Sequence, residues 1–377
     1  MKTGKSWDEL AAEVERRAGL KRDLVASVEK LEAVVVDAEG KPELGLAVAD
    51  GETFGITPHA HSQLSEYASI PLDEYLRMQV EAPELLATFV NRSMKSKATD
   101  RRMLRTLDGA VQAFLDARYR VLANEDVMDA VAPVLRERKL LVLSCELTEK
   151  RLYIKAVDRS IERDVPTGRR MGDDTHGFFD TISPGIVISY SEADGGPLSV
   201  ETFVFTKACT NLAVMGTTVR TQHLSGHKEL SGVDWVLAAR ETRELTGSAI
   251  QDSLRELVSS ALDEAKFEAA EKLLKLAAMS PMELSDAVPV VERVAERFGL
   301  DEREMRAVLE HFIRGRDFTR YGLQAAITRA SADVGDYERA TEMERLGGRV
   351  ILLPPLEWNR ILDGLPRVPR VTRKLAS

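Results

Sequence analysis

The hydrophobic pattern predicts a helix followed by a hairpin at the start of the chain. Apolar residues recur at steps near 3.6 across residues 6–33, which is the spacing of an amphipathic helix. Ser6 is followed three residues later by Glu9, and this pair is the capping-box signature of a helix N-terminus. Residues 32–38 and 44–49 are apolar runs on either side of a turn that contains Gly and Pro, so we expect two paired strands there.

Prolines divide the next segment, residues 57–92, into three short helical stretches. Pro58 suits the first position of a helix, while Pro71 and Pro83 each separate one stretch from the next. Such spacing is typical of a packed helical subdomain, and it also fits a helix-turn-helix. Residues 93–101 are polar and basic, and we expect a loop there.

The middle of the chain is rich in apolar runs of strand length that are separated by turn residues. Residues 103–107 and 110–115 alternate poorly and fit either strands or a helix, with strands as the favoured interpretation. The other expected strands are 139–147, 151–157, 185–191 and 198–206. The last four form two predicted hairpins, because each pair is separated by a short polar or Gly-rich turn. Residues 158–182 contain Pro, Gly and many charges with little periodicity, so we expect a mobile loop there.

Helical periodicity returns between the strands and in the C-terminal third. The expected helices are 124–137 with Asn124 as N-cap, 234–278 as one long helix or a pair, 286–298 ended by Gly299, 302–313 capped by Asp301, and a helix around 321–329. Residues 364–377 contain three arginines, a lysine and two prolines but no acidic residue. We expect this basic tail to be extended, because proline disfavours a helix or a central strand.

Together these elements predict an α+β fold. A helical N-terminal region with a small hairpin is expected over residues 1–95. Residues 96–280 are expected to form a central, mostly antiparallel sheet that is built from hairpins and covered by a long helix. Residues 281–377 are expected to form a helical C-terminal region with the basic, Pro-rich tail.

Composition narrows the class of protein. The chain has 377 residues, of which 44% are hydrophobic and 30% charged, so it is long enough to bury a sizeable core. Its net charge of −9 disfavours wholesale electrostatic binding to nucleic acid but leaves room for a local basic patch. No secretory signal and no stretch of about 18 apolar residues occurs, so we expect no membrane partner and a cytoplasmic location.

The sequence contains no motif for catalysis or for a cofactor. Gly-rich dinucleotide and P-loop patterns are missing, as are the GxSxG and HExxH patterns. The two cysteines, Cys145 and Cys209, are too far apart in sequence for a CxxC zinc site. We therefore predict no catalytic residue, no cofactor and no metal.

Two small clusters resemble metal ligands but fit simpler explanations. His223 and His227 have the spacing that places two imidazoles on one helix face, with Cys209 or His176 as a third ligand. Gly226 between them disfavours a helix, so polar loop histidines are the favoured interpretation. The second cluster is the acidic set Asp173, Asp174, His176 and Asp180. It falls in the predicted loop, where solvated carboxylates are the expected state.

Basic residues gather between positions 101 and 170, and several of them are next to tyrosine. Arginine pairs with phosphates and tyrosine stacks on bases, so this pattern favours nucleic-acid binding. The candidate residues are Arg101, Arg102, Arg105, Arg118, Tyr119, Arg120, Lys150, Arg151, Tyr153, Lys155, Arg169 and Arg170. Acidic residues are interspersed, however, with fifteen Lys or Arg against twelve Asp or Glu from 100 to 170. A mixed, solvated surface therefore remains the alternative.

Several segments, taken in order, resemble those of a known family. They are Ser69–Met78, Ala82–Asn91, Met103–Leu107 with Arg118–Asn124, Arg151–Lys155, Pro184–Glu192, Phe205–Asn211 with His223, and Thr319–Thr328. Over roughly residues 60–335 this order is similar to the family known as "domain of unknown function 932", whose members are carried by phages, plasmids and their hosts. The resemblance implies a phage or plasmid setting, and the family has no agreed activity to carry over.

The leading hypothesis is a nucleic-acid-binding protein, for single strands, that acts in phage or plasmid recombination or replication. Predicted hairpins that feed a curved sheet crossed by a long helix are similar in architecture to single-strand annealing recombinases. One alternative is a non-enzymatic interaction protein that modulates a host factor. A less favoured one is a metal-dependent enzyme that uses His176, His223 and His227.

Three observations would separate these hypotheses. Arginines of residues 101–170 gathered on one groove would favour nucleic-acid binding. An exposed apolar patch without basic surface would favour an interaction protein. Histidines within about 5 Å of one another would favour a metal enzyme. The expected partner is accordingly single-stranded DNA or a host protein, and oligomerisation stays open.

Overall fold

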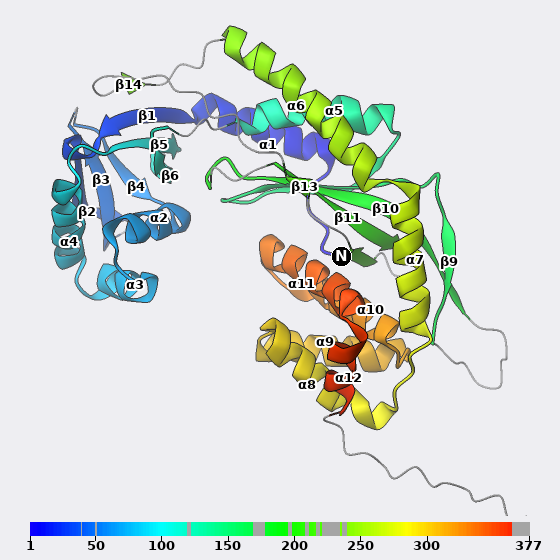
Figure 1. Ribbon diagram of the computed structural model, residues 1–377. Helices are drawn as coiled ribbons and strands as arrows, with labels where there is room; N and C mark the ends of the chain where they lie inside the picture. Colours follow the sequence, from blue (N-terminus) through cyan, green and yellow to red (C-terminus); the bar gives the residue numbers. More distant parts are fainter. Residues whose placement is uncertain are drawn as a thin grey trace, which may run out of the picture.

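The computed structural model describes residues 1–363 except 39, 50, 119–121, 169–177, 195–197, 208–210, 216–218, 221–233 and 236–239. It contains two mostly antiparallel sheets with helices packed on both, and a group of helices at the C-terminal end (Figure 1). The predicted α+β class is therefore confirmed. None of the described helices combines the length and the apolar character needed to cross a bilayer.

The first sheet is formed by the N-terminal third of the chain together with one short strand from much further along. Its strands are β1 (Arg22–Ser27), β2 (Leu31–Ala38), β3 (Lys41–Val48), β4 (Thr53–Ile56), β5 (Arg101–Leu107), β6 (Ala110–Asp116) and β14 (Asp234–Trp235). Their order is β14-β1-β5-β6-β4-β3-β2, and β4 and β6 run parallel. Helices α2 (Pro58–Ala68), α3 (Leu72–Glu81) and α4 (Pro83–Ser96) pack on this sheet, with Leu46, Phe54 and Leu86 in the shared core.

The second sheet lies at the centre of the molecule. Its strands are β7 (Leu141–Leu147), β8 (Leu152–Val157), β9 (Arg163–Pro166), β10 (Phe179–Tyr190), β11 (Ser199–Thr206), β12 (Asn211–Val214) and β13 (Val219–Arg220). The order is β12-β11-β10-β8-β7, with β9 paired to β10 and β13 paired to β11. All its strand pairs among the described residues are antiparallel.

Helices cover both faces of this central sheet (Figure 1). One face packs against α1 (Trp7–Leu20), α5 (Asn124–Glu137) and α6 (Arg240–Ala261). The other packs against α7 (Glu264–Ala278), α10 (Arg320–Ala330) and α11 (Tyr337–Leu352). Side chains alternate between the two faces, so that Ile154 of β8 belongs to one core and its neighbour Tyr153 to the other.

The remaining helices form a C-terminal layer with its own core. They are α8 (Ala287–Phe298), α9 (Glu302–Gly315) and α12 (Pro355–Asp363), and single 3-10 turns lie at Val28–Lys30, Leu284–Asp286 and Ser331–Asp333. Gly348 of α11 lies so close to β12 that a Cβ atom there would be 1.7 Å from the carbonyl oxygen of Val214. Glycine is therefore required for this helix to pack against the central sheet.

Much of the local prediction is confirmed. The hairpins at 32–49, 139–157 and 185–206 form as expected, and the three helices of residues 57–92 are present as α2, α3 and α4. Helix α5 has the predicted bounds, although its N-cap is Ala123 rather than Asn124. Asp301 caps α9 through a capping box, and Gly299 ends α8 in the left-handed conformation.

Three predicted elements need correction. The helix expected over residues 6–33 ends at Leu20, because residues 22–27 pair with β5 as strand β1. The loop expected at 93–101 is shorter than predicted, since α4 runs to Ser96 and β5 begins at Arg101. The loop expected at 158–182 contains β9, which pairs with the beginning of β10, while residues 169–177 lie outside the described residues.

Two C-terminal helices were not predicted. Helix α11 contains Gly347 and Gly348, which weaken the helical signal in the sequence. Helix α12 follows Pro354 and has Pro355 at its first position, where proline is favourable. The tail itself, residues 364–377, lies outside the described residues.

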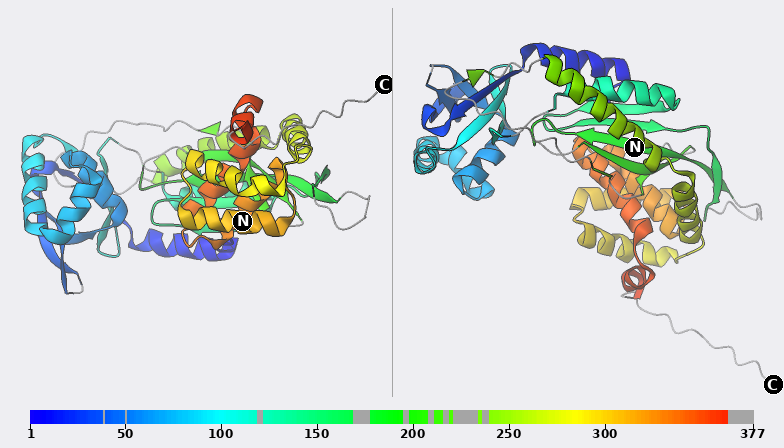
Figure 2. Two further views of the ribbon diagram at one scale, coloured as in Figure 1. Left: turned by 90° about the horizontal axis from the view of Figure 1, so that it is seen from below. Right: turned by 45° about the horizontal axis from the view of Figure 1, so that its top comes forward.

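Strand pairing extends the first unit beyond the boundary predicted near residue 95. Strand β5 pairs with β1 and β6 pairs with β4, so residues 101–116 belong to the N-terminal sheet. The chain then enters the second unit with α5. Viewed from below, the first sheet and its helices lie beside the central sheet (Figure 2).

Candidate functional site

A polar pocket lies where the two units meet. It is formed by the end of α1, the strands β5 and β6, the beginning of α5, and the β7–β8 and β10–β11 turns. Its lining residues are Arg17, Lys21, Arg105, Leu107, Gln112, Asn124, Leu147, Thr148, Glu149, Lys150, Arg151, Glu192 and Ala193. Five of them are basic and two are acidic, and the space is about 400 Å³ including its open mouth.

Glu192 binds three groups in the pocket. It lies two residues after the end of β10, and its Oε2 is 3.1 Å from Lys21 Nζ and 3.0 Å from Arg105 Nη1. The same oxygen accepts a hydrogen bond from the backbone N–H of Asn124, at the first turn of α5. A carboxylate at this position is stabilised by the unsatisfied N–H groups of the helix N-terminus. One side chain thus joins α1, β5 and α5.

Arg105 is held by two carboxylates. Its Nε and Nη2 donate to the two oxygens of Asp23, each at 2.7 Å, in a bidentate pair across β1 and β5. Its side chain is 5% exposed. Burial alone would lower the pKa of Arg105, but the hydrogen bonds that it donates to Asp23 and the charge of Glu192 outweigh burial and raise that pKa. The guanidinium therefore stays charged at the base of the pocket.

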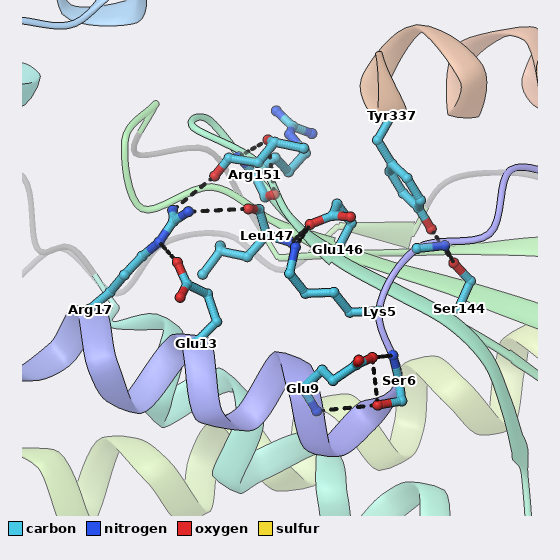
Figure 3. Close-up of polar contacts among 12 residues, drawn as sticks. Lys5, Ser6, Glu9, Glu13, Arg17, Ser144, Glu146, Leu147, Arg151 and Tyr337 are labelled. Atoms are coloured by element: carbon cyan, nitrogen blue, oxygen red, sulfur yellow. Dashed lines mark hydrogen bonds and ion pairs between the residues drawn. The ribbon is translucent and has the colours of Figure 1, made fainter. Parts of the chain in front are cut away.

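Arg17 reaches from α1 across to the end of β7 (Figure 3). Its guanidinium donates to the carbonyl oxygens of Thr148 at 3.1 Å and Leu147 at 3.4 Å. On its other side it donates to Glu13, and hydrogen bonds from Arg16 and Arg17 lower the pKa of Glu13 to about 2. This arrangement fixes a positive charge beside the β7–β8 turn.

A second polar cluster lies next to the pocket mouth. His59 Nε2 is 2.9 Å from Asp194, and Arg151 Nη2 is 3.3 Å from the same carboxylate. Burial would raise the pKa of Asp194, but His59 and Arg151 lower it to about 2. The backbone N–H of His59, in the first turn of α2, donates to Glu149. The β7–β8 and β10–β11 turns are thereby tied to the first unit.

Asn124 contributes an acceptor with no partner. The residue is 5% exposed, and no described residue donates to its Oδ1. A buried acceptor costs free energy unless a donor reaches it. A ligand with an N–H or O–H group beside its anionic part would satisfy this atom.

Three of the predicted nucleic-acid residues come together in the pocket, namely Arg105, Lys150 and Arg151. Arg102 lies elsewhere, with its guanidinium 4.4 Å from the ring centroid of Tyr67. Arg118 is exposed and pairs with Asp116 at 2.9 Å. Arg101 is half-buried on β5, outside the pocket lining. Tyr119, Arg120, Arg169 and Arg170 lie outside the described residues.

Lys155 and Tyr153 are inside the protein. Lys155 has no exposed surface, and its Nζ lies 2.6 Å from Glu344 of α11. Burial lowers the pKa of Lys155, and the charge of Glu344 opposes that shift. Tyr153 is 3% exposed and contacts the ring of Tyr337. Neither can touch a phosphate in this conformation, because both faces of β8 are covered by helices.

Few of the metal-ligand candidates fall on described residues. Cys145 is buried, and burial raises the pKa of its thiol to about 12, so it is an inert core residue. Asp180 is buried and accepts a hydrogen bond from Tyr321 at 2.9 Å. Among the residues that the structure describes, no group of three His, Cys, Asp or Glu side chains could hold a metal ion. The others, Asp173, Asp174, His176, Cys209, His223 and His227, lie outside the described part of the chain.

The sequence interpretation missed Arg17, Lys21 and Glu192. The first two lie four residues apart at the end of an amphipathic helix, where basic residues are common and mark no site. Glu192 carried a weak signal, since it is the first charged residue after a long apolar strand.

No protein-family model matches this chain, and no curated protein or solved structure is significantly similar to it. The resemblance to the "domain of unknown function 932" family therefore stays a prediction.

Proposed function

We propose that this protein binds the phosphate backbone of single-stranded nucleic acid at the pocket between its two units. The observation that carries the proposal is the convergence of five basic side chains there, three of them from the set that the sequence singled out. Arginine and lysine bind phosphate through charge-assisted hydrogen bonds. Binding of this kind would take place in the cytoplasm.

The accessible charges lie at the rim. Lys150 is exposed, and the side chains of Arg151 and Arg17 are 33% and 24% exposed. Lys21 and Arg105 lie deeper and are neutralised by the carboxylates of Glu192 and its neighbours. The rim residues are thus the ones that meet a phosphate, and the deeper pair fixes the shape of the floor.

The shape of the pocket favours a single strand. The enclosed part of the pocket is only about the size of a water molecule, so a bound phosphate group would lie at its open mouth. A duplex presents its phosphates on a rigid rod, whereas a flexible strand can bend to bring a single phosphate to the mouth of a small pocket. The unpaired Oδ1 of Asn124 is suited to a base amino group or a sugar hydroxyl. Among the residues that the structure describes, none that lines the pocket is aromatic, so the proposed contact is to the backbone rather than by stacking.

Together with the family resemblance, this binding favours a role in annealing or handling single strands during phage or plasmid recombination or replication. The test is fluorescence anisotropy with labelled single-stranded and double-stranded oligonucleotides over a salt series. Two or three phosphate contacts predict a slope of log affinity against log salt of about −1.4 to −2 for single strands. Absence of binding at the lowest salt would refute the proposal, as would equal affinity for the duplex.

A further inference from the structure

Helix α3 presents an apolar stripe to the solvent. Leu72, Leu76 and Val80 recur every four residues, and their exposed fractions are 42%, 44% and 83%. Leu85 and Phe89 on the adjoining α4 are 51% and 50% exposed. An amphipathic helix of a globular protein normally turns such a stripe toward the core. A group of large exposed apolar side chains is typical of an interaction surface.

The opposite side of α3 is fixed to the protein, so the stripe cannot turn inward. Tyr75 is fully buried, and its hydroxyl lies 3.0 Å from Nδ1 of His61 on α2. Gln79 lies 3.0 Å from the other ring nitrogen of His61. Met78 is buried between these two contacts. The rotation of α3 about its axis is thereby set, with the stripe outward.

Acidic residues accompany the stripe. They are Asp73, Glu74, Glu81 and Glu84, all exposed. Arg77 is bound by Glu74 at 2.6 Å and by Glu81 at 2.7 Å, so its charge is already compensated. Two exposed basic residues, Arg92 and Lys95, lie further along α4. Two copies of this surface would face each other with like charges, whereas a segment that combines apolar and basic side chains would complement it.

The chain contains such a segment. Residues 364–377 carry Leu365, Val368, Val371 and Leu375 together with Arg367, Arg370, Arg373 and Lys374, and no acidic residue. We propose that residues 364–377 bind to the exposed stripe of α3 and α4. The cations of this segment would then pair with the acidic residues of α3, and they would be withheld from other anions. This inference is independent of the proposed nucleic-acid binding.

The test is photo-crosslinking in the full chain. Val371 is replaced by the photoreactive residue benzoylphenylalanine, and the crosslinked peptides are identified by mass spectrometry after irradiation. The expected result is crosslinking to residues 72–89, within one molecule or between two. The double substitution Leu76→Glu with Val80→Glu should reduce these crosslinks at least tenfold. Val80→Glu alone, at the most exposed position, should reduce the crosslinks severalfold. This single variant replaces the double variant if the double variant does not fold.

The matched control is Leu276→Glu on α7, which alters a residue that is 62% exposed. It should leave the crosslinks to residues 72–89 unchanged. Absence of crosslinks, crosslinks confined to other elements, or crosslinks to residues 72–89 that survive the α3 substitutions would each overturn the proposal. Light scattering measures self-association of the same variants. If the α3 substitutions abolish self-association but leave the crosslinks intact, the stripe binds a second copy of the protein and the proposal is wrong.

Discussion

Two basic residues from the same predicted set, Arg105 and Lys155, occupy regions of opposite character. Both are buried against carboxylates. Arg105 lines a pocket, and its partners Asp23 and Glu192 are 18% and 15% exposed. Lys155 and its partner Glu344 have no exposed surface at all, between β8 and α11. Whether a buried basic residue borders a pocket or lies wholly inside the protein thus depends on how its strand is covered by other elements.

The two regions also differ in how their charges are compensated. In the pocket, three carboxylates share two basic side chains, since Lys21 also lies 3.1 Å from Glu125. In the sealed region around Lys155 and Glu344, the carboxylate of Glu344 pairs with the ammonium of Lys155, which lies 4.6 Å from the ring centroid of Tyr337. The charge of Glu344 also acts on the buried N-terminal ammonium of Met1. Loss of one partner should therefore matter more where no water can replace it.

The largest expected effect is in the sealed region. Glu344→Gln leaves Lys155 buried without a counter-charge, and this should lower the free energy of unfolding by about 3–5 kcal/mol. Urea denaturation monitored by circular dichroism measures the change. The control is the double substitution Lys155→Met with Glu344→Leu, which removes both charges and should restore most of the stability. A loss of less than about 1 kcal/mol for Glu344→Gln would show that water reaches the pair after all.

The buried His61 gives the protein a pH-dependent contribution to stability, in contrast to the two ion pairs. Burial lowers its pKa from 6.5 to about 4, and this outweighs the opposite influence of Glu149. The unfolded state therefore binds the proton first, so stability should fall as the pH drops from about 6.5 to 4 and be unaffected above that window. The expected loss is about 2 kcal/mol at pH 5 and about 3 kcal/mol below pH 4.

Denaturation of the wild type and of His61→Gln at several pH values tests this contribution. The substitution should flatten the pH dependence between 6.5 and 4, because glutamine does not titrate. Parallel curves for the two proteins would mean that the imidazole is already protonated in the folded state or stays hydrated there.

An intermediate effect on stability is expected for Glu192 in the pocket. Glu192→Gln removes the charge that Lys21 and Arg105 share, and should lower the stability by about 1–2 kcal/mol. Because it also frees positive charge beside the pocket, it should strengthen binding of a single-stranded oligonucleotide severalfold. Anisotropy titrations measure the affinity. Weaker binding by the folded variant would instead mean that Glu192 contacts the ligand or holds the pocket open.

The smallest effect on stability is expected at the rim. Lys150 is exposed, so Lys150→Ala should leave the melting temperature unchanged. It should weaken single-strand binding severalfold and flatten the salt slope by about 0.7, the value for one phosphate contact. Lys272→Ala, at an exposed lysine of α7, is the matched control and should change neither. Equal effects of the two substitutions would mean that only overall charge matters.

The sequence predicted the fold class and most elements because local signals agree with the tertiary structure in those places. Ser6 with Glu9 and Asp301 with Glu304 mark helix starts that form as expected. The local pattern predicted the wrong secondary structure where pairing with a distant strand determines it. Residues 22–27 continue a helical pattern, yet they pair with β5. Local periodicity carries no information about such a partner.

The candidate site was predictable only in part. Arg105, Lys150 and Arg151 stood out as basic residues, but so did Lys155, which is sealed in the interior. Lys155 differs from the other three because helix α11 covers its strand, and the sequence pattern did not predict α11. Arg17 and Glu192 drew no attention, since a charged residue becomes part of a site only through neighbours that are distant in sequence.

The pair of Lys155 and Glu344 also has a consequence for biosynthesis. The two residues are separated by 189 positions. At about 5–20 residues per second, a ribosome produces Glu344 roughly 10–40 s after Lys155. During that interval the lysine has no counter-charge, so its face of the central sheet must stay hydrated. The nascent chain is therefore expected to hold this sheet half-covered, and a chaperone could reach that face until α11 emerges.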